Sequence, residues 1–182
     1  ESRGLGDVYK RQTTDTAKYD NVATDDHTRQ EVDHTYDEHA VGSSFTAGGN
    51  ATLAAVNAGA GGNARTDGKG NVTLTGSTAT SGTDAAQVAN GAGALTIAGN
   101  GNVAINEGRE EHDSATAVHV NRGSFVSSTS TDSIQSTQAN IGVSSTASGD
   151  SVTVQSGKDL TVQGSNVVGT HDVNLNAVGN VN

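Results

Sequence analysis

The chain has 182 residues, a formal net charge of −10 and an isoelectric point near 4.8, so its charge argues against a nucleic-acid partner and against docking on anionic lipid. Hydrophobic residues make up 32% of the sequence and aromatic residues 3%, which is too little for a bulky globular core. The alternatives are disorder or a thin core of small aliphatic side chains in a repeat fold.

Several residue types are missing. Cys is absent, which excludes disulfides, thiolate metal sites and thiol nucleophiles, and suits a life outside the cytosol. Pro is absent as well, as expected for stacked strands whose backbone N–H groups must all donate. Met is absent and the sequence stops within a recurring pattern at Gly179–Asn182, so we expect a fragment of a longer protein.

The N-terminal forty residues lack the short Gly-Asn motif that recurs later in the chain. Residues 1–12, ESRGLGDVYKRQ, resemble a translated adapter sequence, and we expect them to pack against nothing. Residues 13–40 are acidic and polar, with three His residues among the acids, and they predict irregular or weakly paired structure.

From Val41 onward, Gly followed by Asn or Asp recurs before short segments in which apolar residues alternate with polar ones. Period two is typical of a strand with one face turned inward. We predict parallel strands at Val72–Thr75, Leu95–Ala98, Val103–Asn106, Val152–Gln155, Leu160–Gln163 and Val173–Asn176. Their inward side chains should share one core, which would include Val152, Val154, Leu160, Val162, Val173 and Leu175.

The spacing of the motif predicts coils of about 21 residues. Asn50 to Asn71 and Asp159 to Asn180 are each 21 positions apart, and Asp150 to Asp172 are 22 apart. A unit of this size cannot bury its apolar face alone, so successive units must stack. Gly and Asn at fixed offsets are expected to supply corner conformations with positive φ. The coil register within 56–92 stays open, because that region is rich in Gly, Ala and Thr.

A longer repeat overlies the short one. VGSSFTAGG, from Val41, recurs as IGVSSTASG, from Ile141, and an acidic segment with His precedes each copy. The predicted organisation is an acidic polar segment of a first repeat (13–40), its coils (41–108), a Ser/Thr-rich excursion (109–140), and the truncated coils of a second repeat (141–182). The acidic segment and the Ser/Thr-rich segment are both expected to be irregular excursions from the coils.

The segment Gly108–Asn182 resembles the haemagglutinin repeat of filamentous haemagglutinin-like exoproteins. The EEHD start, the Ser/Thr stretch, the GDSVTVQSGKDLTVQGSNV core and the closing DVNLNAVGNV carry the resemblance, and residues 19–108 look like a preceding copy. The resemblance implies an all-β, right-handed parallel β-helix. It also implies a filament segment of a protein secreted to the surface of a Gram-negative bacterium by a partner transporter in the outer membrane.

The resemblance implies two possible functions, of which we expect the first and keep the second as the alternative. One is adhesion to a target-cell surface through a receptor that the sequence does not identify. The other is contact-dependent growth inhibition, in which the filament assists the delivery of a toxin. A carbohydrate-active β-helix enzyme is the least favoured reading. End-to-end self-association of the isolated fragment is also expected, because stacked coils expose unpaired strand edges.

Acidic and His residues gather in four clusters, which could bind a divalent metal. They are Asp25-Asp26-His27, Asp33-His34, Asp37-Glu38-His39 and Glu110-Glu111-His112-Asp113. Their spacing matches no ligand motif, so a solvated acidic surface is the preferred interpretation and no metal or cofactor site is assigned. No catalytic residue is assigned either, because no base is placed beside a nucleophile.

Overall fold

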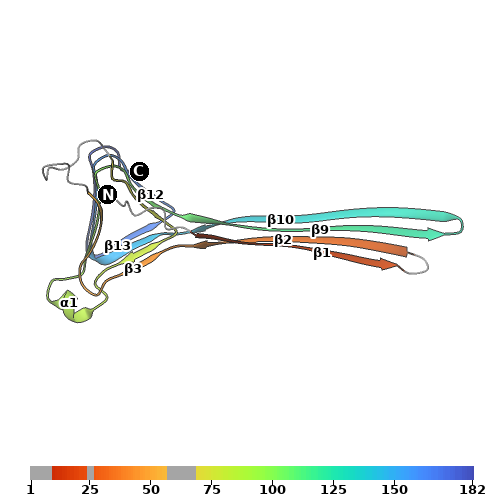
Figure 1. Ribbon diagram of the computed structural model, residues 1–182, viewed down its shortest axis with the longest axis horizontal. Helices are drawn as coiled ribbons and strands as arrows, with labels where there is room; N and C mark the ends of the chain where they lie inside the picture. The colour runs from red at the N-terminus through yellow and green to blue at the C-terminus, as the bar shows by residue number, and fades with distance from the viewer. Residues whose placement is uncertain (1–9, 24–26, 57–68) are drawn as a thin grey trace. The chain divides into compact units, whose positions relative to one another are not determined.

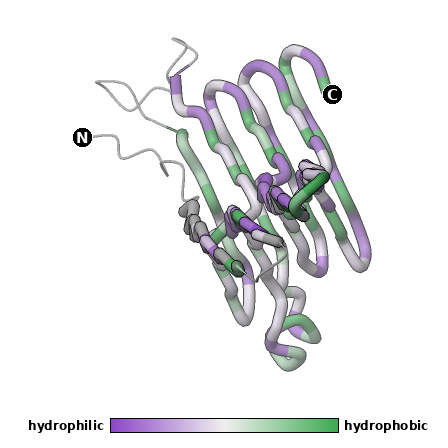
Figure 2. The backbone as a smooth tube through the Cα atoms, turned by 90° about the vertical axis from the view of Figure 1, so that its right-hand side faces the viewer, coloured by the Kyte–Doolittle hydropathy of each residue, from purple (hydrophilic) through white to green (hydrophobic). Residues whose placement is uncertain are grey.

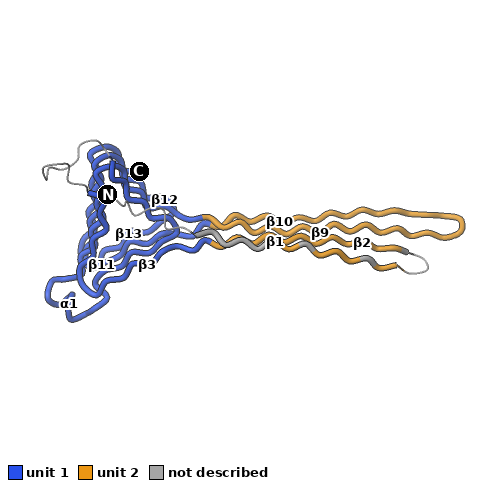
Figure 3. Tube along the Cα trace, viewed as in Figure 1, with its two compact units in different colours: residues 1–10, 40–108, 142–182 blue, residues 11–39, 109–141 orange. Residues whose placement is uncertain are grey.

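The computed structural model describes residues 10–23, 27–56 and 69–182, and the chain forms two compact units (Figure 3). In the first, which we call the coil unit, the described residues are Lys10, 40–56, 69–108 and 142–182. In the second, the hairpin unit, they are 11–23, 27–39 and 109–141. Both units consist almost entirely of β-strands, which confirms the predicted all-β class.

Stacked parallel strands make up the coil unit (Figures 1 and 2). Row A is a three-stranded sheet of β5 (Val72–Thr75), β8 (Val103–Asn106) and β12 (Leu160–Gln163). Rows B and C together form a six-stranded sheet. Row B begins with β3 (Ser44–Thr46) and β6 (Thr78–Thr80), and row C begins with β4 (Ala51–Ala55) and β7 (Ala94–Gly99). The longer strands β11 (Thr146–Ser156) and β13 (Asn166–Ala177) continue both rows.

In each row the strands follow one another in chain order, so the chain returns to every row one strand further along the stack. The long strand β11 takes part in two rows, since residues 146–148 pair with β6 in row B and residues 151–156 pair with β7 in row C. All six predicted strands are present and pair in parallel.

The core is a thin layer of aliphatic side chains in register between coils. In row A, Val72 lies beside Val103, and Val103 lies beside Leu160. In row C, Leu95 lies beside Val152 and Ile97 beside Val154. The members are at most 5% exposed, and they are Val72, Leu74, Ala79, Leu95, Ile97, Val103, Ile105, Ala147, Val152, Val154 and Leu160. Alternation therefore placed the core correctly in the inner coils.

Three of the six predicted core residues are not fully buried. Val162 is partly buried and packs against the core, whereas the other two are exposed. Val173 and Leu175 pair in register with Val152 and Val154, so they occupy the equivalent row positions, yet they are 46% and 37% exposed. Among the described residues, β13 pairs with β11 only, and its inward face is therefore covered on one side. The prediction that Val173 and Leu175 are buried in the core was therefore wrong.

The Asn and Asp of the repeated motif form a ladder of side chains along the corner before row A. Asn71 Oδ1 accepts a hydrogen bond from the backbone N–H of Asn102 at 2.8 Å, and Asn102 Oδ1 accepts from Asp159 N at 3.2 Å. Asp159 Oδ1 then accepts from Asn180 N at 2.8 Å. Asn and Asp recur because each side chain satisfies a corner N–H of the next coil.

This ladder corrects two expectations. Among the described residues, positive φ is confined to glycines, such as Gly70 at 100° and Gly93 at 121°, so Asn does not supply the strained corner conformation. Asn50 and Asn71 are not one coil apart, because Asn50 precedes row C and its Oδ1 accepts from Gly93 and Ala94 N–H groups. The 21-residue coil holds between Asp159 and Asn180.

Serines form a second ladder before row B. The backbone N–H groups of Ser43, Ser77 and Ser145 donate to the hydroxyls of Ser77, Ser145 and Ser165 at 3.1, 3.0 and 3.2 Å. Each acceptor hydroxyl donates in turn to a carbonyl at the end of the preceding row A strand, as Ser145 Oγ does to Asn106 O at 2.6 Å. Ser145 and Ser77 are buried, so these bonds satisfy polar groups that water cannot reach.

Two insertions lengthen individual coils. The helix α1 (Ala85–Ala89) lies between β6 and β7, and its N-cap Asp84 accepts from the Ala86 and Gln87 N–H groups. It explains why Asn71 and Asn102 are 31 positions apart. The second insertion is the excursion after β8, which separates Asn102 from Asp159 by 57 positions.

The helix α1 has five residues, and no helix in the described ranges is long and apolar enough to cross a membrane.

The hairpin unit is regular, contrary to the irregular structure predicted for both excursions. It is a four-stranded sheet in the order β1 (Lys10–Ala23), β2 (His27–Val41), β9 (Gly108–Ser124) and β10 (Ser127–Val143). β2 and β9 are antiparallel, and the two-residue link between β9 and β10 makes that pair antiparallel too. Most side chains of these strands are Ser, Thr, His, Asp or Glu, so no sustained apolar alternation predicted the strands.

The predicted adapter segment, 1–12, is described only from Lys10. Residues 1–9 lie outside the described residues, and Lys10–Gln12 begin β1. That these residues pack against nothing is therefore wrong for the backbone of the last three.

Candidate metal centre

Four metal-ligating side chains meet on neighbouring strands of the hairpin unit. Asp37 of β2 lies directly opposite His112 of β9 in the antiparallel ladder. Continuing that register by two residues places His39 opposite Glu110. Because side chains two apart share a face of a strand, all four project from one face of the sheet. We call these four residues the His–carboxylate cluster.

The distances within the cluster are short. His112 Nδ1 lies 2.9 Å from Asp37 Oδ1, and His112 Nε2 lies 3.5 Å from Glu110 Oε2. His39 Nδ1 lies 3.9 Å from Glu110 Oε1. The rings of His39 and His112 meet edge to face, with centroids 5.6 Å apart. One ligand atom from each of His39, Glu110 and His112 can therefore be chosen so that all three lie within 4.8 Å of one another.

The carboxylates set the electrostatics of the cluster. The hydrogen bond to Asp37 raises the pKa of His112 above its ordinary 6.5, the bond to Glu110 adds to this, and desolvation opposes it. The Glu110 and His112 side chains are 17% and 25% exposed, whereas Asp37 and His39 lie more in solvent. The cluster is thus anchored on β9 and open on the side of β2.

The other predicted metal-cluster residues lie elsewhere. Asp25 and Asp26 fall outside the described residues, and His27 pairs with Arg122. Asp33 accepts a hydrogen bond from Thr116 Oγ1 at 2.8 Å. Side chains on the opposite face of the sheet belong to His34, Glu38, Glu111 and Asp113, by the same alternation.

A signal for the cluster was present in the sequence. Asp37-Glu38-His39 and Glu110-Glu111-His112 both place a carboxylate two positions before a His. In an antiparallel pair with this register, each carboxylate lies opposite the His of the other strand. The signal requires the register, which the sequence did not reveal.

The described residues contain two further His–carboxylate pairs, without a third ligand in the same group. His119 of β9 contacts Asp132 of β10 through Nδ1. His171 of β13 contacts Asp150 of β11 at 2.7 Å, one coil apart within the coil unit. Such pairs tie adjacent strands.

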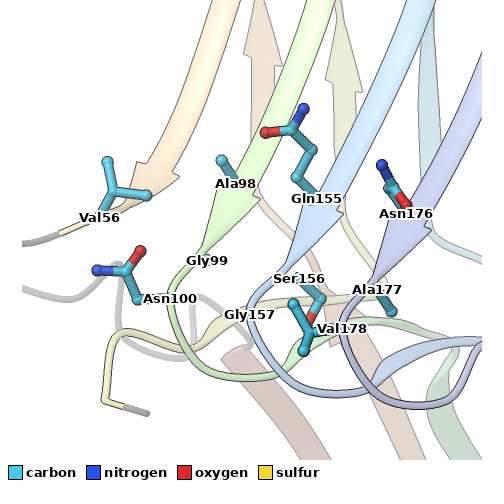
Figure 4. A pocket seen from close by; sticks show the side chains of 10 residues that line it. All are labelled: Val56, Ala98, Gly99, Asn100, Gln155, Ser156, Gly157, Asn176, Ala177 and Val178. Carbon is cyan, nitrogen blue, oxygen red and sulfur yellow. The ribbon is translucent and has the colours of Figure 1, made fainter. Parts of the chain in front are cut away.

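A groove of about 400 Å³ crosses the corners after β4, β7, β11 and β13 of the coil unit (Figure 4). Its ten lining residues are Val56, Ala98, Gly99, Asn100, Gln155, Ser156, Gly157, Asn176, Ala177 and Val178, none of them ionisable. Buried Ser156 bonds the Gly101 and Asp159 carbonyls, at 2.9 and 2.8 Å, so it closes a corner. The groove presents amides and small side chains rather than a general acid or base.

Comparison with known proteins finds a partial likeness. Over 61 residues the chain is 49% identical to a tRNA nuclease CdiA of Burkholderia pseudomallei, and likewise to the tRNA nuclease CdiA-2 of its strain 1026b. The match covers 34% of this chain, but only 5% of the first protein and 2% of the second. No protein-family model matches the sequence, and no solved structure matches the fold. The chain is thus similar to CdiA proteins over a third of its length.

Proposed function

We propose that this chain is a filament segment of a secreted CdiA-type exoprotein, and that it assists toxin delivery during contact-dependent growth inhibition. The observation that carries the proposal is the 61-residue likeness to CdiA proteins, supported by rows of parallel strands stacked in chain order. The matched segment is a small part of those proteins, so their nuclease activity is not assigned to this chain.

The fold proposed for the filament is a right-handed parallel β-helix on the surface of a Gram-negative bacterium, exported by an outer-membrane transporter. Its role is mechanical. Each coil pairs its backbone with the coils before and after it, and the Asn and Ser ladders tie the corners. A rod of this kind holds a distal module away from the cell. Adhesion to a target-cell surface is the function expected from the repeat alone, and the CdiA likeness favours delivery over it.

The test uses the parent protein expressed at the cell surface. Leu160→Asp places an unpaired charge in the core of row A, where Leu160 is fully buried, and should cost several kcal/mol. Gln163→Asp is the matched control, because Gln163 ends the same strand in solvent. We expect Leu160→Asp to abolish growth inhibition of contacted target cells and to raise protease sensitivity at the surface, while Gln163→Asp leaves both unchanged.

Outcomes separate the functional classes. If cells producing the parent bind target cells without inhibiting them, adhesion replaces delivery. Turnover of a polysaccharide by the purified chain would instead support a carbohydrate-active enzyme. Inhibition that persists in Leu160→Asp would remove the filament from the mechanism.

A further inference from the structure

We propose that the His–carboxylate cluster binds one divalent metal ion of the zinc class. His39, Glu110 and His112 are the ligands, and Asp37 orients the ring of His112. The site lies within the hairpin unit and does not depend on the proposed function.

The ligand atoms are close to the separations that zinc requires. Zinc bonds of about 2.0–2.2 Å in a tetrahedron place ligand atoms roughly 3.3–3.6 Å apart. Glu110 Oε2 lies 3.5 Å from His112 Nε2, and Glu110 Oε1 lies 3.9 Å from His39 Nδ1, so each carboxylate oxygen faces one imidazole. The three ligand atoms lie within 4.8 Å of one another, and the His39 side chain, which is 60% exposed, can rotate toward a shared ion.

Asp37 leaves the correct nitrogen of His112 available. Its carboxylate accepts from Nδ1 at 2.9 Å, so Nε2, the nitrogen facing Glu110, can carry the lone pair that ligates the metal. A carboxylate behind a metal-ligating imidazole fixes the ring and raises its basicity. Asp37 is therefore a positioning residue, and a water molecule would complete a tetrahedral set.

The donor set selects the class of metal. Two imidazoles and a carboxylate suit zinc, copper or nickel, whereas calcium and magnesium prefer oxygen ligands. Asp33 and Glu31 lie on the same face of β2, four and six residues before Asp37. Their charges favour a cation, and Arg29, the next residue on this face, is paired with Glu31 at 2.6 Å.

Two regular strands hold the residues of the site in place. Asp37 and His39 lie on β2, and Glu110 and His112 lie on β9. The register of these long strands is held by a ladder that runs from His27 to Asp37. The metal would bridge the two strands across the middle of the four-stranded sheet, between the β1–β2 and β9–β10 pairs. It would act as a clamp at the end of the ladder, close to where the strands leave the hairpin unit.

The test titrates Zn²⁺ into the full chain by isothermal calorimetry, with Co²⁺ absorption as a second readout of tetrahedral coordination. We expect one ion per chain, a visible Co²⁺ band, and loss of both in His39→Ala and His112→Ala. Asp37→Asn should keep the site but weaken it roughly 10–100-fold, as expected for an outer partner of a ligating His. His34→Ala is the matched control, because His34 lies on the same strand and projects from the other face.

The controls separate a specific zinc site from general binding of cations to an acidic surface. Circular dichroism first establishes that each variant is folded, and Glu110→Gln, which keeps the shape of the ligand, replaces any variant that is not. In wild type, Nε2 of His112 should shift in nitrogen NMR on binding Zn²⁺, and excess Ca²⁺ should not compete. Absence of binding at submillimolar Zn²⁺, or equal binding by wild type, His34→Ala and the ligand variants, would overturn the site and show only the general affinity of an acidic surface.

Discussion

Truncation of Leu160 tests whether the thin core holds the coils together. Leu160 is fully buried in row A, beside Val103 of the preceding coil and bridged to Val181 on the other side. Leu160→Ala removes three carbons from a site enclosed on both sides, where collapse is limited. The expected loss of unfolding free energy is about 2–5 kcal/mol.

Leu175 provides the matched control. It is the same residue type at an inward row position, but it is 37% exposed because β13 has one paired side among the described residues. Leu175→Ala should cost roughly 1 kcal/mol, since only part of its side chain leaves an apolar environment. The difference between the variants isolates burial from residue chemistry.

Thermal unfolding followed by far-UV circular dichroism measures the effect. For a chain of this size, each kcal/mol lowers the midpoint by about 2–4 °C, so Leu160→Ala should melt roughly 4–20 °C below the parent. Hydrogen exchange assigns the loss to the coil unit, because the Val103 N–H donates to Asp159 O beside the altered residue. Equal midpoints for Leu160→Ala and Leu175→Ala would refute a continuous core through row A.

The corner ladders and the exposed edge give three further predictions. Asn102→Ala should cost about 0.5–1.5 kcal/mol in chemical denaturation by removing the acceptor for the Asp159 N–H, whereas Asn102→Asp, which keeps that acceptor, should match the parent. Ser145→Ala leaves the buried Ser77 N–H without its acceptor and should cost about 1–3 kcal/mol, and the exposed neighbour Ser144→Ala should be neutral; equal effects would deny the ladder its role. The isolated chain should self-associate through β13, more strongly at high salt, where its net charge of −10 is screened. Light scattering that shows a monomer at both low and high salt would count against an open edge.

Local pattern was sufficient to place the strands of the coil unit. Val103 and Ile105, or Val152 and Val154, alternate with polar residues, and an inward face two residues in period can be read without knowing the partner strand. The recurrence of Gly with Asn or Asp also located the corners. The prediction that Asn supplies a positive-φ corner was wrong. The Asn side chain instead accepts a hydrogen bond from the next coil, and that partner is 31 or 57 positions away in the sequence.

The sequence by itself therefore determined the all-β class, the strands with one apolar face and the inner core. Only the tertiary structure decided the hairpin unit and the His–carboxylate cluster. The strands of the hairpin unit are mostly polar on both faces, so no sustained hydrophobic alternation marks them or specifies their register. The alignment of Asp37 with His112, across 75 positions of sequence, comes from backbone pairing, and a slip of one residue would turn the ligands to opposite faces.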